Sequence, residues 1–236
     1  MTEGQGPTDE GKVRYLKYTF FKLSKGFRSK DGEARKAMKA DFLSALGRHV
    51  GKVGLQCFSL VGLRGDVDFL VVADADDVLE FQALVSDLLG TSLGRYLDVP
   101  YSYLALRRGS QYLGEHRHPG QEVAGQSGTG ISKFIFVYPF VKKREWYRLP
   151  FEERRRMMGD HFRIGHKYPK IKINTGYSFG LDDQEFVLSF EGDDPSDFLK
   201  LVEELRGSEA SMYTALETPI FTCARVRPER MLDLAG

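Results

Sequence analysis

The sequence predicts an α+β fold made of two tandem copies of one strand–helix–strand–strand–helix–strand unit. Three observations predict it: an internal repeat, an aromatic, β-branched segment that opens each copy, and an amphipathic helical pattern that follows each opening segment. The 236 residues are enough for one large domain or two small ones, each with its own hydrophobic core. The repeat decides in favour of two small units.

The repeat is clearest between residues 68–88 and residues 185–205, which align without a gap. The first segment reads DFLVVADADDVLEFQALVSDL and the second reads EFVLSFEGDDPSDFLKLVEEL. In each copy a short apolar run predicts a strand. Two aspartates follow, at 76–77 and at 193–194, where a helix N-terminus favours a capping side chain and negative charge. Apolar residues at helical spacing come next, so each segment predicts a strand followed by a helix.

The upstream part of each copy predicts one more strand and one more helix. Residues 15–27 and 133–143 are rich in aromatic and β-branched side chains, which is typical of strands. Charged amphipathic helices are expected over about 33–49 and 150–166. The resulting order is that of a ferredoxin-like domain, an antiparallel sheet with both helices on one face. Two such domains in tandem predict the dimeric α+β barrel-like arrangement.

The predicted domain boundaries follow from the repeat and from composition. Residues 1–12 are polar and are expected to form a flexible N-terminus, and the first domain covers 13–110. Residues 111–130 are rich in Gly, Gln and Ser and predict a linker or a long functional loop. The second domain covers 131–236.

Composition excludes several classes of protein. The formal net charge of +1 gives no reason to expect a nucleic acid or an anionic membrane as partner. Two cysteines, Cys57 and Cys223, are too few for a disulfide framework or a structural zinc site. No apolar run approaches the roughly 18 residues of a membrane helix, and the N-terminus lacks the pattern of a signal peptide. We therefore expect a cytoplasmic protein.

One of the five histidines has an unusual setting. His161 lies on the apolar side of its predicted helix, with Met157, Met158 and Ile164 as helical neighbours. An imidazole there is costly unless it is hydrogen-bonded or bound to a metal. The matching position of the first copy is Phe42. This asymmetry between the copies leaves two interpretations, a satisfied core histidine and a metal ligand.

The strand that opens the second copy ends in further candidates. Tyr138 precedes a proline near the strand end, where the first copy has Thr19, and it is either a core tyrosine or a functional one. Lys142 is followed by Trp146, the only tryptophan of the chain. A cation beside aromatic rings could bind a flat anionic ligand by ion pairing and stacking, or could be a solvated strand end.

The segment KIKIN at 170–174 alternates, with the two isoleucines on one face of a predicted strand and the two lysines and Asn174 on the other. It is either a half-exposed strand or a strand that projects the amide of Asn174 into a cavity.

These motifs together resemble the chlorite dismutase superfamily of haem proteins, which includes chlorite dismutases and coproheme decarboxylases. The resemblance rests on the tyrosine, proline and lysine of YPFVK (138–142), on WYRLPFEERRRMMGDH (146–161), on TGYSFGLDD (175–183) and on FEGDD (190–194). It covers about residues 130–225. It implies two ferredoxin-like domains per subunit, of which only the C-terminal one holds haem, and commonly a homopentamer. The haem is either protohaem or iron coproporphyrin.

The resemblance also implies roles for individual residues. His161 falls on the proximal iron ligand, and Glu209 on the acidic residue that accepts the ligand's other N–H. Tyr138 falls on the decarboxylase tyrosine thought to carry a radical next to a haem propionate. The remaining implied contacts with the porphyrin or its propionates are those of Lys142, Trp146, Met158 and, more weakly, Ser211.

One position departs from the family pattern. Thirteen residues after the ligand, chlorite dismutases have an arginine and many decarboxylases a glutamine, and counting gives Asn174 here. A neutral amide does not supply the cation that holds an oxyanion such as chlorite. The short segment between Tyr138 and Trp146 instead favours the dismutase branch.

The leading hypothesis is therefore a haem-binding oxidoreductase, in its most specific form a peroxide-dependent coproheme decarboxylase with peroxidase-like chemistry. The first alternative is a chlorite dismutase, which converts chlorite to chloride and oxygen. An alternative of another class is a haem carrier or sensor, or a structural member of the family that has lost haem.

Overall fold

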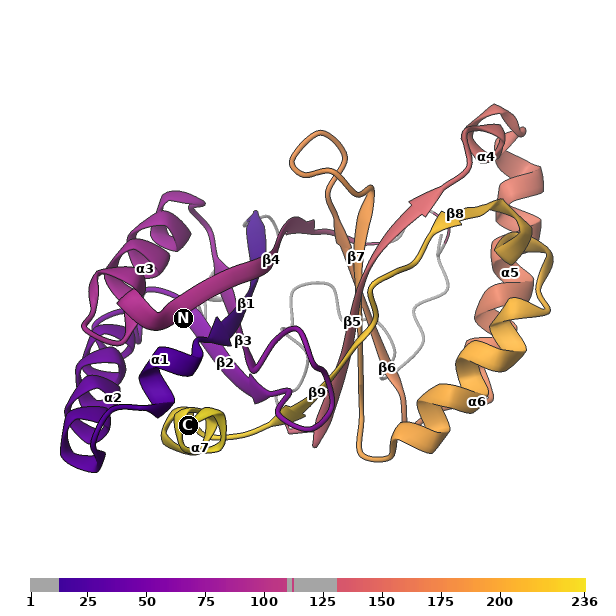
Figure 1. Ribbon diagram of the computed structural model, residues 1–236. Helices are drawn as coiled ribbons and strands as arrows, with labels where there is room; N and C mark the ends of the chain where they lie inside the picture. The colour runs from indigo at the N-terminus through magenta and orange to yellow at the C-terminus, as the bar shows by residue number, and fades with distance from the viewer. Residues whose placement is uncertain (1–12, 110–111, 113–130) are drawn as a thin grey trace, which may run out of the picture.

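The computed structural model describes residues 13–109, residue 112 and residues 131–236. The chain forms a mixed α+β structure in which antiparallel strands lie in the middle and helices cover the sheet on two opposite sides (Figure 1). The expected flexible N-terminus and nearly all of the expected linker lie outside the described residues. No helix in the described part of the chain is long and apolar enough to cross a membrane.

The N-terminal half has the element order that the repeat predicts, with two short helical turns added. Its elements are β1 (Arg14–Leu23), α1 (Lys25–Arg28), α2 (Gly32–Gly47), β2 (Gly54–Ser59), β3 (Phe69–Ala75), α3 (Leu79–Gly90), the 3-10 turn η1 (Gly94–Tyr96) and β4 (Leu97–Arg107).

The C-terminal half repeats this order and adds a short strand and a terminal helix. Its elements are β5 (Phe134–Lys142), α4 (Arg144–Arg148), α5 (Phe151–His166), β6 (Lys172–Tyr177), β7 (Phe186–Gly192), α6 (Pro195–Arg206), η2 (Glu209–Tyr213), β8 (Thr214–Leu216), β9 (Phe221–Arg225) and α7 (Pro228–Ala235).

The aspartates singled out in the repeat begin the second long helix of each half. Asp194 is the N-cap of α6, and its carboxylate accepts a hydrogen bond from the backbone N–H of Ser196 at 2.8 Å. Asp77 accepts one from Leu79, the first residue of α3, at 2.9 Å. Both carboxylates satisfy N–H groups that a helix leaves without an intrahelical partner.

The two sheets close into one barrel within a single chain. The strand order is β7-β6-β4-β1-β3-β2-β9-β5, and β5 pairs with β7 again, while β8 pairs with the last two residues of β5. Two seams join the halves, β2 with β9 and β4 with β6. Side chains therefore face either the barrel interior or the helical layer outside it, and strand parity decides between them.

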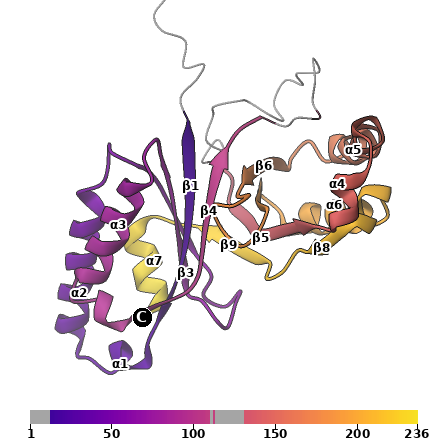
Figure 2. The same ribbon diagram turned by 90° about the horizontal axis from the view of Figure 1, so that it is seen from above.

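Three large hydrophobic clusters of the described residues fill this architecture, and a smaller one surrounds Trp146. One occupies the barrel interior and includes Phe20, Val137 and Phe221. The second lies between the N-terminal sheet and helices α2 and α3, and the third between the C-terminal sheet and helices α5 and α6. Figure 2 shows the two helical layers on opposite sides of the strands.

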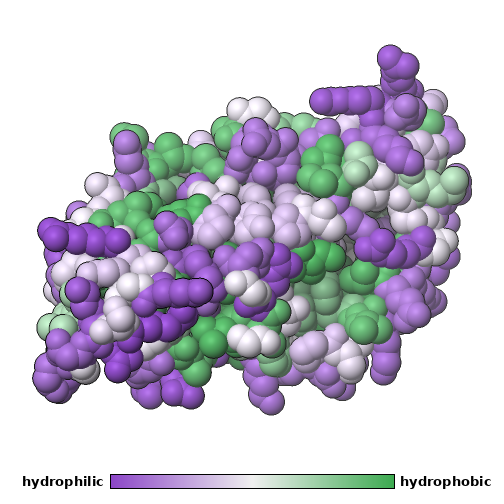
Figure 3. All heavy atoms as spheres, viewed as in Figure 1, coloured by the Kyte–Doolittle hydropathy of each residue, from purple (hydrophilic) through white to green (hydrophobic). Residues whose placement is uncertain are grey.

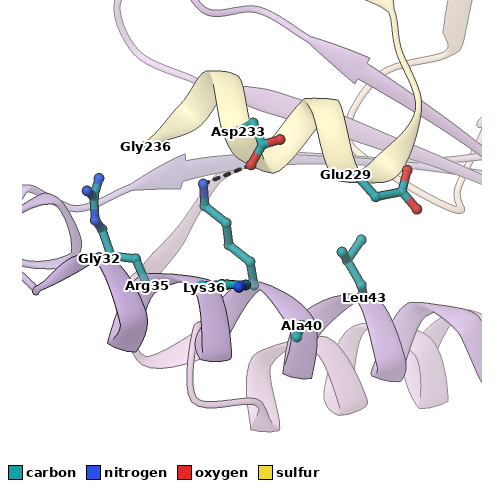
Figure 4. Close-up of a pocket in the computed structure, with 9 residues that line it drawn as sticks. Gly32, Arg35, Lys36, Ala40, Leu43, Glu229, Asp233 and Gly236 are labelled. Carbon is teal, nitrogen blue, oxygen red and sulfur yellow. Dashed lines mark hydrogen bonds and ion pairs between the residues drawn. The ribbon is translucent and has the colours of Figure 1, made fainter.

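The last helix crosses from the C-terminal half to the N-terminal half. Met231, Leu232 and Ala235 of α7 are buried in the core that α2 and α3 cover. A groove of about 460 Å³ remains between α2 and α7, and the ion pair of Lys39 with Asp233 bridges it at 3.1 Å (Figure 4). Helix α7 thus belongs to residues 131–236 in sequence and packs against the core of the N-terminal half.

Candidate functional site

Helix α5 carries His161 over the outer face of the C-terminal sheet. Pro150 stands at its N-cap position, and Glu152 and Glu153 in its first turn complement the helix dipole. Ile164 packs one turn after His161 into the cluster shared with the sheet, and Met157 one turn before it is fully buried. The helix therefore presents its apolar side, and His161 with it, to the interior of this half.

His161 has no hydrogen-bond partner among the described residues. Its Nδ1 is buried and unpaired, while the residue as a whole keeps part of its surface exposed. Burial and the positive charge of Lys142 lower the pKa of His161 from 6.5 to about 4. The imidazole is therefore neutral at pH 7, as metal ligation requires. Of the two interpretations, the satisfied core histidine is the one that this environment disfavours.

Lys142 lies at the end of β5 beside the only tryptophan. Its Nζ donates a hydrogen bond to the carbonyl oxygen of Ala210 at 2.7 Å and stands 4.5 Å from the ring centroid of Trp146. Burial lowers the pKa of Lys142 to about 8, and the nearby carboxylates Glu185 and Glu217 oppose that shift. A cation this poorly solvated favours an anionic partner.

Trp146 and Met158 belong to a small aromatic cluster next to Lys142. Trp146 is 3% exposed and packs with Met157 and Ala210, and Met158 lines the same cluster. The ring of Tyr213 lies 5.4 Å from that of Trp146. The structure thus brings three of the predicted site residues together around Ala210.

Tyr138 faces the helical layer rather than the barrel interior. Its ring stacks on Phe190 at 5.9 Å with an interplanar angle of 5°. Burial and the negative charge of Glu217 raise the pKa of Tyr138, so its phenol stays protonated. Glu217 in turn pairs with Arg206, the last residue of α6, at 2.5 Å.

Glu209 and Ser211 lie on η2 and have other partners in this structure. Both carboxylate oxygens of Glu209 accept from Arg156 at 2.9 Å, and Glu209 makes no hydrogen bond with His161. Ser211 Oγ lies 2.7 Å from the carbonyl oxygens of both Arg206 and Ser208. Glu209 thus ties η2 to α5, whereas Ser211 closes its own turn.

Asn174 is not on the side of the sheet that carries Tyr138. The register pairs Tyr138 with Leu188 and Leu188 with Thr175, so these three share the helix-facing side. Asn174 lies on the barrel-facing side, where its Nδ2 donates to Glu191 at 3.3 Å. Counting thirteen residues from His161 therefore reaches a residue that faces the barrel interior, whereas its neighbour Thr175 occupies the helix-facing position.

The sequence reasoning did not single out Glu185, a buried carboxylate immediately before β7. Its Oε2 accepts hydrogen bonds from the backbone N–H of Lys142 at 2.8 Å and from the hydroxyl of Tyr147 at 2.5 Å. The repeat carries the signal that could have found it, because Glu185 aligns with Asp68, which is buried too.

The family model described as chlorite dismutase matches residues 35–226. The chain belongs to the chlorite dismutase family. A coproheme decarboxylase from Mycolicibacterium smegmatis is 34% identical over 221 residues, which are 93% of each chain. The family predicted from the motifs of the C-terminal half is therefore confirmed, and the match extends into the N-terminal half.

Solved structures of the chlorite dismutase family share the fold. A chlorite dismutase from Candidatus Nitrospira defluvii in complex with imidazole superposes with a TM-score of 0.87 at 24% identity, covering 96% of this chain and 97% of that one. A heme-binding protein from Thermus thermophilus superposes with a TM-score of 0.80 at 22% identity, covering 94% of this chain and 95% of that one.

Proposed function

We propose that this protein is a haem-dependent oxidoreductase and that its reaction is the peroxide-dependent decarboxylation of iron coproporphyrin. The observation that carries the proposal is His161, a neutral imidazole with a buried, unpaired nitrogen on the apolar side of α5. The match to a coproheme decarboxylase over nearly the whole chain supports the choice of substrate.

The residues around His161 fit an iron porphyrin better than a bare metal ion. In the described part of the chain, no three His, Cys, Asp or Glu side chains converge as a metal site. An iron bound to His161 thus needs ligands that the described residues do not provide, and a porphyrin would supply them. Figure 3 shows apolar side chains, in green, between the sheet and the helical layer of the C-terminal half, as a flat and largely apolar ligand requires.

Each proposed residue has a task that its environment supports. His161 binds the iron through a ring nitrogen, and the porphyrin iron supplies redox chemistry with peroxide as the oxidant. Lys142, with Trp146 and Met158 beside it, binds a propionate and orients the ring. Tyr138 would keep its proton at Oη beside the porphyrin, because burial keeps the phenol neutral.

Two further residues, Glu209 and Ser211, have to exchange their present hydrogen-bond partners to take their proposed roles. Glu209 is proposed to accept the Nδ1–H of His161, for which its carboxylate must exchange Arg156 for the imidazole. Ser211 is proposed to donate to a propionate, in exchange for the carbonyl oxygens it contacts. We also propose that the two halves are duplicated ferredoxin-like units and that the chain works as a homopentamer, as family resemblance implies. We further propose a cytoplasmic location, on the sequence features given above.

The second candidate function is chlorite dismutation, favoured by the short segment between Tyr138 and Trp146. The helix-facing positions of β6 argue against it, because Ile173 and Thr175 provide no cation for an oxyanion there. The third candidate, a haem carrier or a haem-free member, requires no oxidant chemistry.

One reconstitution experiment separates these candidates. The purified protein is loaded with iron coproporphyrin, titrated with peroxide, and the porphyrin mass is followed. We expect stepwise loss of carbon dioxide, which the matched variant Tyr138→Phe abolishes while it keeps the Soret band. Iron porphyrin that stays bound and unchanged would overturn the decarboxylase, and oxygen evolution from chlorite would establish the dismutase instead. Unchanged porphyrin affinity of His161→Ala would overturn the ligand assignment.

A further inference from the structure

The segment that joins β5 to α4 depends on one buried carboxylate. The Glu185 side chain is 9% exposed, and a carboxylate so far removed from water is costly unless it is paired. Its Oε2 accepts from Lys142 N–H at 2.8 Å and from Tyr147 Oη–H at 2.5 Å. Arg144 Nη1 lies 3.6 Å from Oε1. Three partners within six residues of chain therefore converge on Glu185.

The hydrogen bond to the backbone of Lys142 is placed where β5 leaves the sheet. The register of β5 against β8 shifts between Val141 and Lys142. Such an irregularity releases a backbone N–H from the regular ladder, and Glu185 accepts it. The next N–H, that of Lys143, returns to the backbone of Tyr213 at 2.7 Å. Glu185 thus fixes the direction in which the Lys142 side chain leaves the strand.

That direction determines what Lys142 can bind. An ammonium group has three donors, and one of them is used by the carbonyl oxygen of Ala210. No other described residue accepts a hydrogen bond from Nζ, so two donors remain for a ligand. The Trp146 ring 4.5 Å away limits the positions that the ammonium group can take.

The first half contains a similar arrangement, with an apolar residue at the position of Lys142. Asp68, the repeat counterpart of Glu185, accepts from Leu23 N–H at the end of β1 at 2.8 Å and from Lys22 Nζ at 3.0 Å. Leu23 occupies the position of Lys142, and its side chain is buried in the core. In the N-terminal half a buried carboxylate therefore holds a strand end whose residue at the position of Lys142 is apolar.

We infer that Glu185 is a positioning residue that holds Lys142 and Trp146 in the arrangement that receives a carboxylate of the porphyrin. This inference rests on the proposed function, because it assigns Lys142 to a propionate. It adds a residue that acts through Lys142 and Tyr147 and does not itself touch the ligand.

The test compares Glu185→Ala with the matched variant Asp68→Ala, which removes the corresponding buried carboxylate of the other half. Two readouts are used: the emission of Trp146 in the porphyrin-free protein, and the dissociation constants of iron coproporphyrin and of its tetramethyl ester. We expect Glu185→Ala to shift the Trp146 emission and to weaken coproporphyrin binding about ten-fold, with little change for the ester. Glu185→Gln, whose amide oxygen still accepts from Lys142 N–H, should restore part of the loss.

Asp68→Ala should lower the free energy of unfolding and leave both readouts as in the unmodified protein. Equal weakening of acid and ester binding by Glu185→Ala, or equal effects of the two variants, would overturn the inference. If the unmodified protein binds neither porphyrin, the proposed function fails. The emission of Trp146 then still decides whether Glu185 positions the segment that joins β5 to α4.

Discussion

At the scale of single residues, His161 is unusual because no described residue forms a hydrogen bond with its buried Nδ1. Phe42, its counterpart in the first half, is fully buried among aromatic rings, which is the ordinary solution for that helix position. His161 places a polar ring at the same position and leaves its Nδ1 without a partner. A residue that costs stability where an apolar one would serve indicates a binding role.

The cost of His161 predicts a pH dependence of stability for the porphyrin-free protein. The folded pKa of about 4 lies below the ordinary histidine value of 6.5, so between these pH values the unfolded chain binds more protons. Stability from this group is complete above about pH 6.5 and is lost as the pH falls to about 4, by about 3 kcal/mol. Urea unfolding of His161→Phe across this range should show a flatter pH profile than the unmodified protein. Parallel profiles would contradict the assigned environment.

The opposite faces of β6 predict different effects for neighbouring substitutions. Asn174→Ala removes a donor from the buried Glu191 and should lower the free energy of unfolding by about 1–2 kcal/mol, with unchanged affinity for iron coproporphyrin. Thr175→Phe adds volume on the helix-facing side and should weaken that affinity about ten-fold. Absorbance titration and urea unfolding measure the two effects. Loss of porphyrin affinity in Asn174→Ala alone would restore Asn174 to the site.

The limits of sequence reasoning at this scale are visible in the same strand. Alternation correctly separates Ile173 from Asn174, but both faces of β6 are half-buried, so the pattern does not tell which face meets the helices. His161 was found because a repeat provides its apolar counterpart. Glu209 could not be placed, because its contact with Arg156 depends on how η2 packs against α5.

At the scale of elements, the two copies use equivalent caps and should respond equally to their loss. Asp194→Ala leaves the backbone N–H of Ser196 without its acceptor and should cost about 1 kcal/mol. Asp77→Ala at the start of α3 should cost a similar amount. Asn is as good an N-cap as Asp, so Asp194→Asn should keep most of the stability. Denaturant midpoints measure all three, and a negligible effect of both alanine variants would contradict the shared role.

Long elements with a repeat were predictable and short ones were not. The helices expected at 33–49 and 150–166 are found at Gly32–Gly47 and Phe151–His166, because periodicity is reliable over four turns. The eight-residue helix α7 is too short for its pattern to stand out, and its docking site belongs to the other half. The packing of α7 against the N-terminal half depends on tertiary contacts, which no local sequence pattern encodes.

At the scale of the whole molecule, strand pairing between the two halves joins their sheets into one closed barrel. The repeat predicts two sheets, each with two exposed edges, and an exposed edge is a liability. Pairing of β2 with β9 and of β4 with β6 removes these edges, and α7 adds a third link. The barrel-like arrangement in this chain is therefore one continuous ring of strands. The sequence repeat does not predict which strands pair across the two seams.

The seam between β4 and β6 provides the test of this coupling. A Cβ added at Gly176 would lie 2.6 Å from the Cβ of Ala105, closer than such atoms approach in proteins, so Gly176→Ala must push the strands apart. We expect a loss of about 1–3 kcal/mol, partly recovered when Ala105→Gly is added, because the second change makes room for the new methyl group. Since the barrel is one closed ring, calorimetry should show a single transition that moves as a whole. A transition of the N-terminal half that stays in place while the other shifts would show that the halves unfold independently.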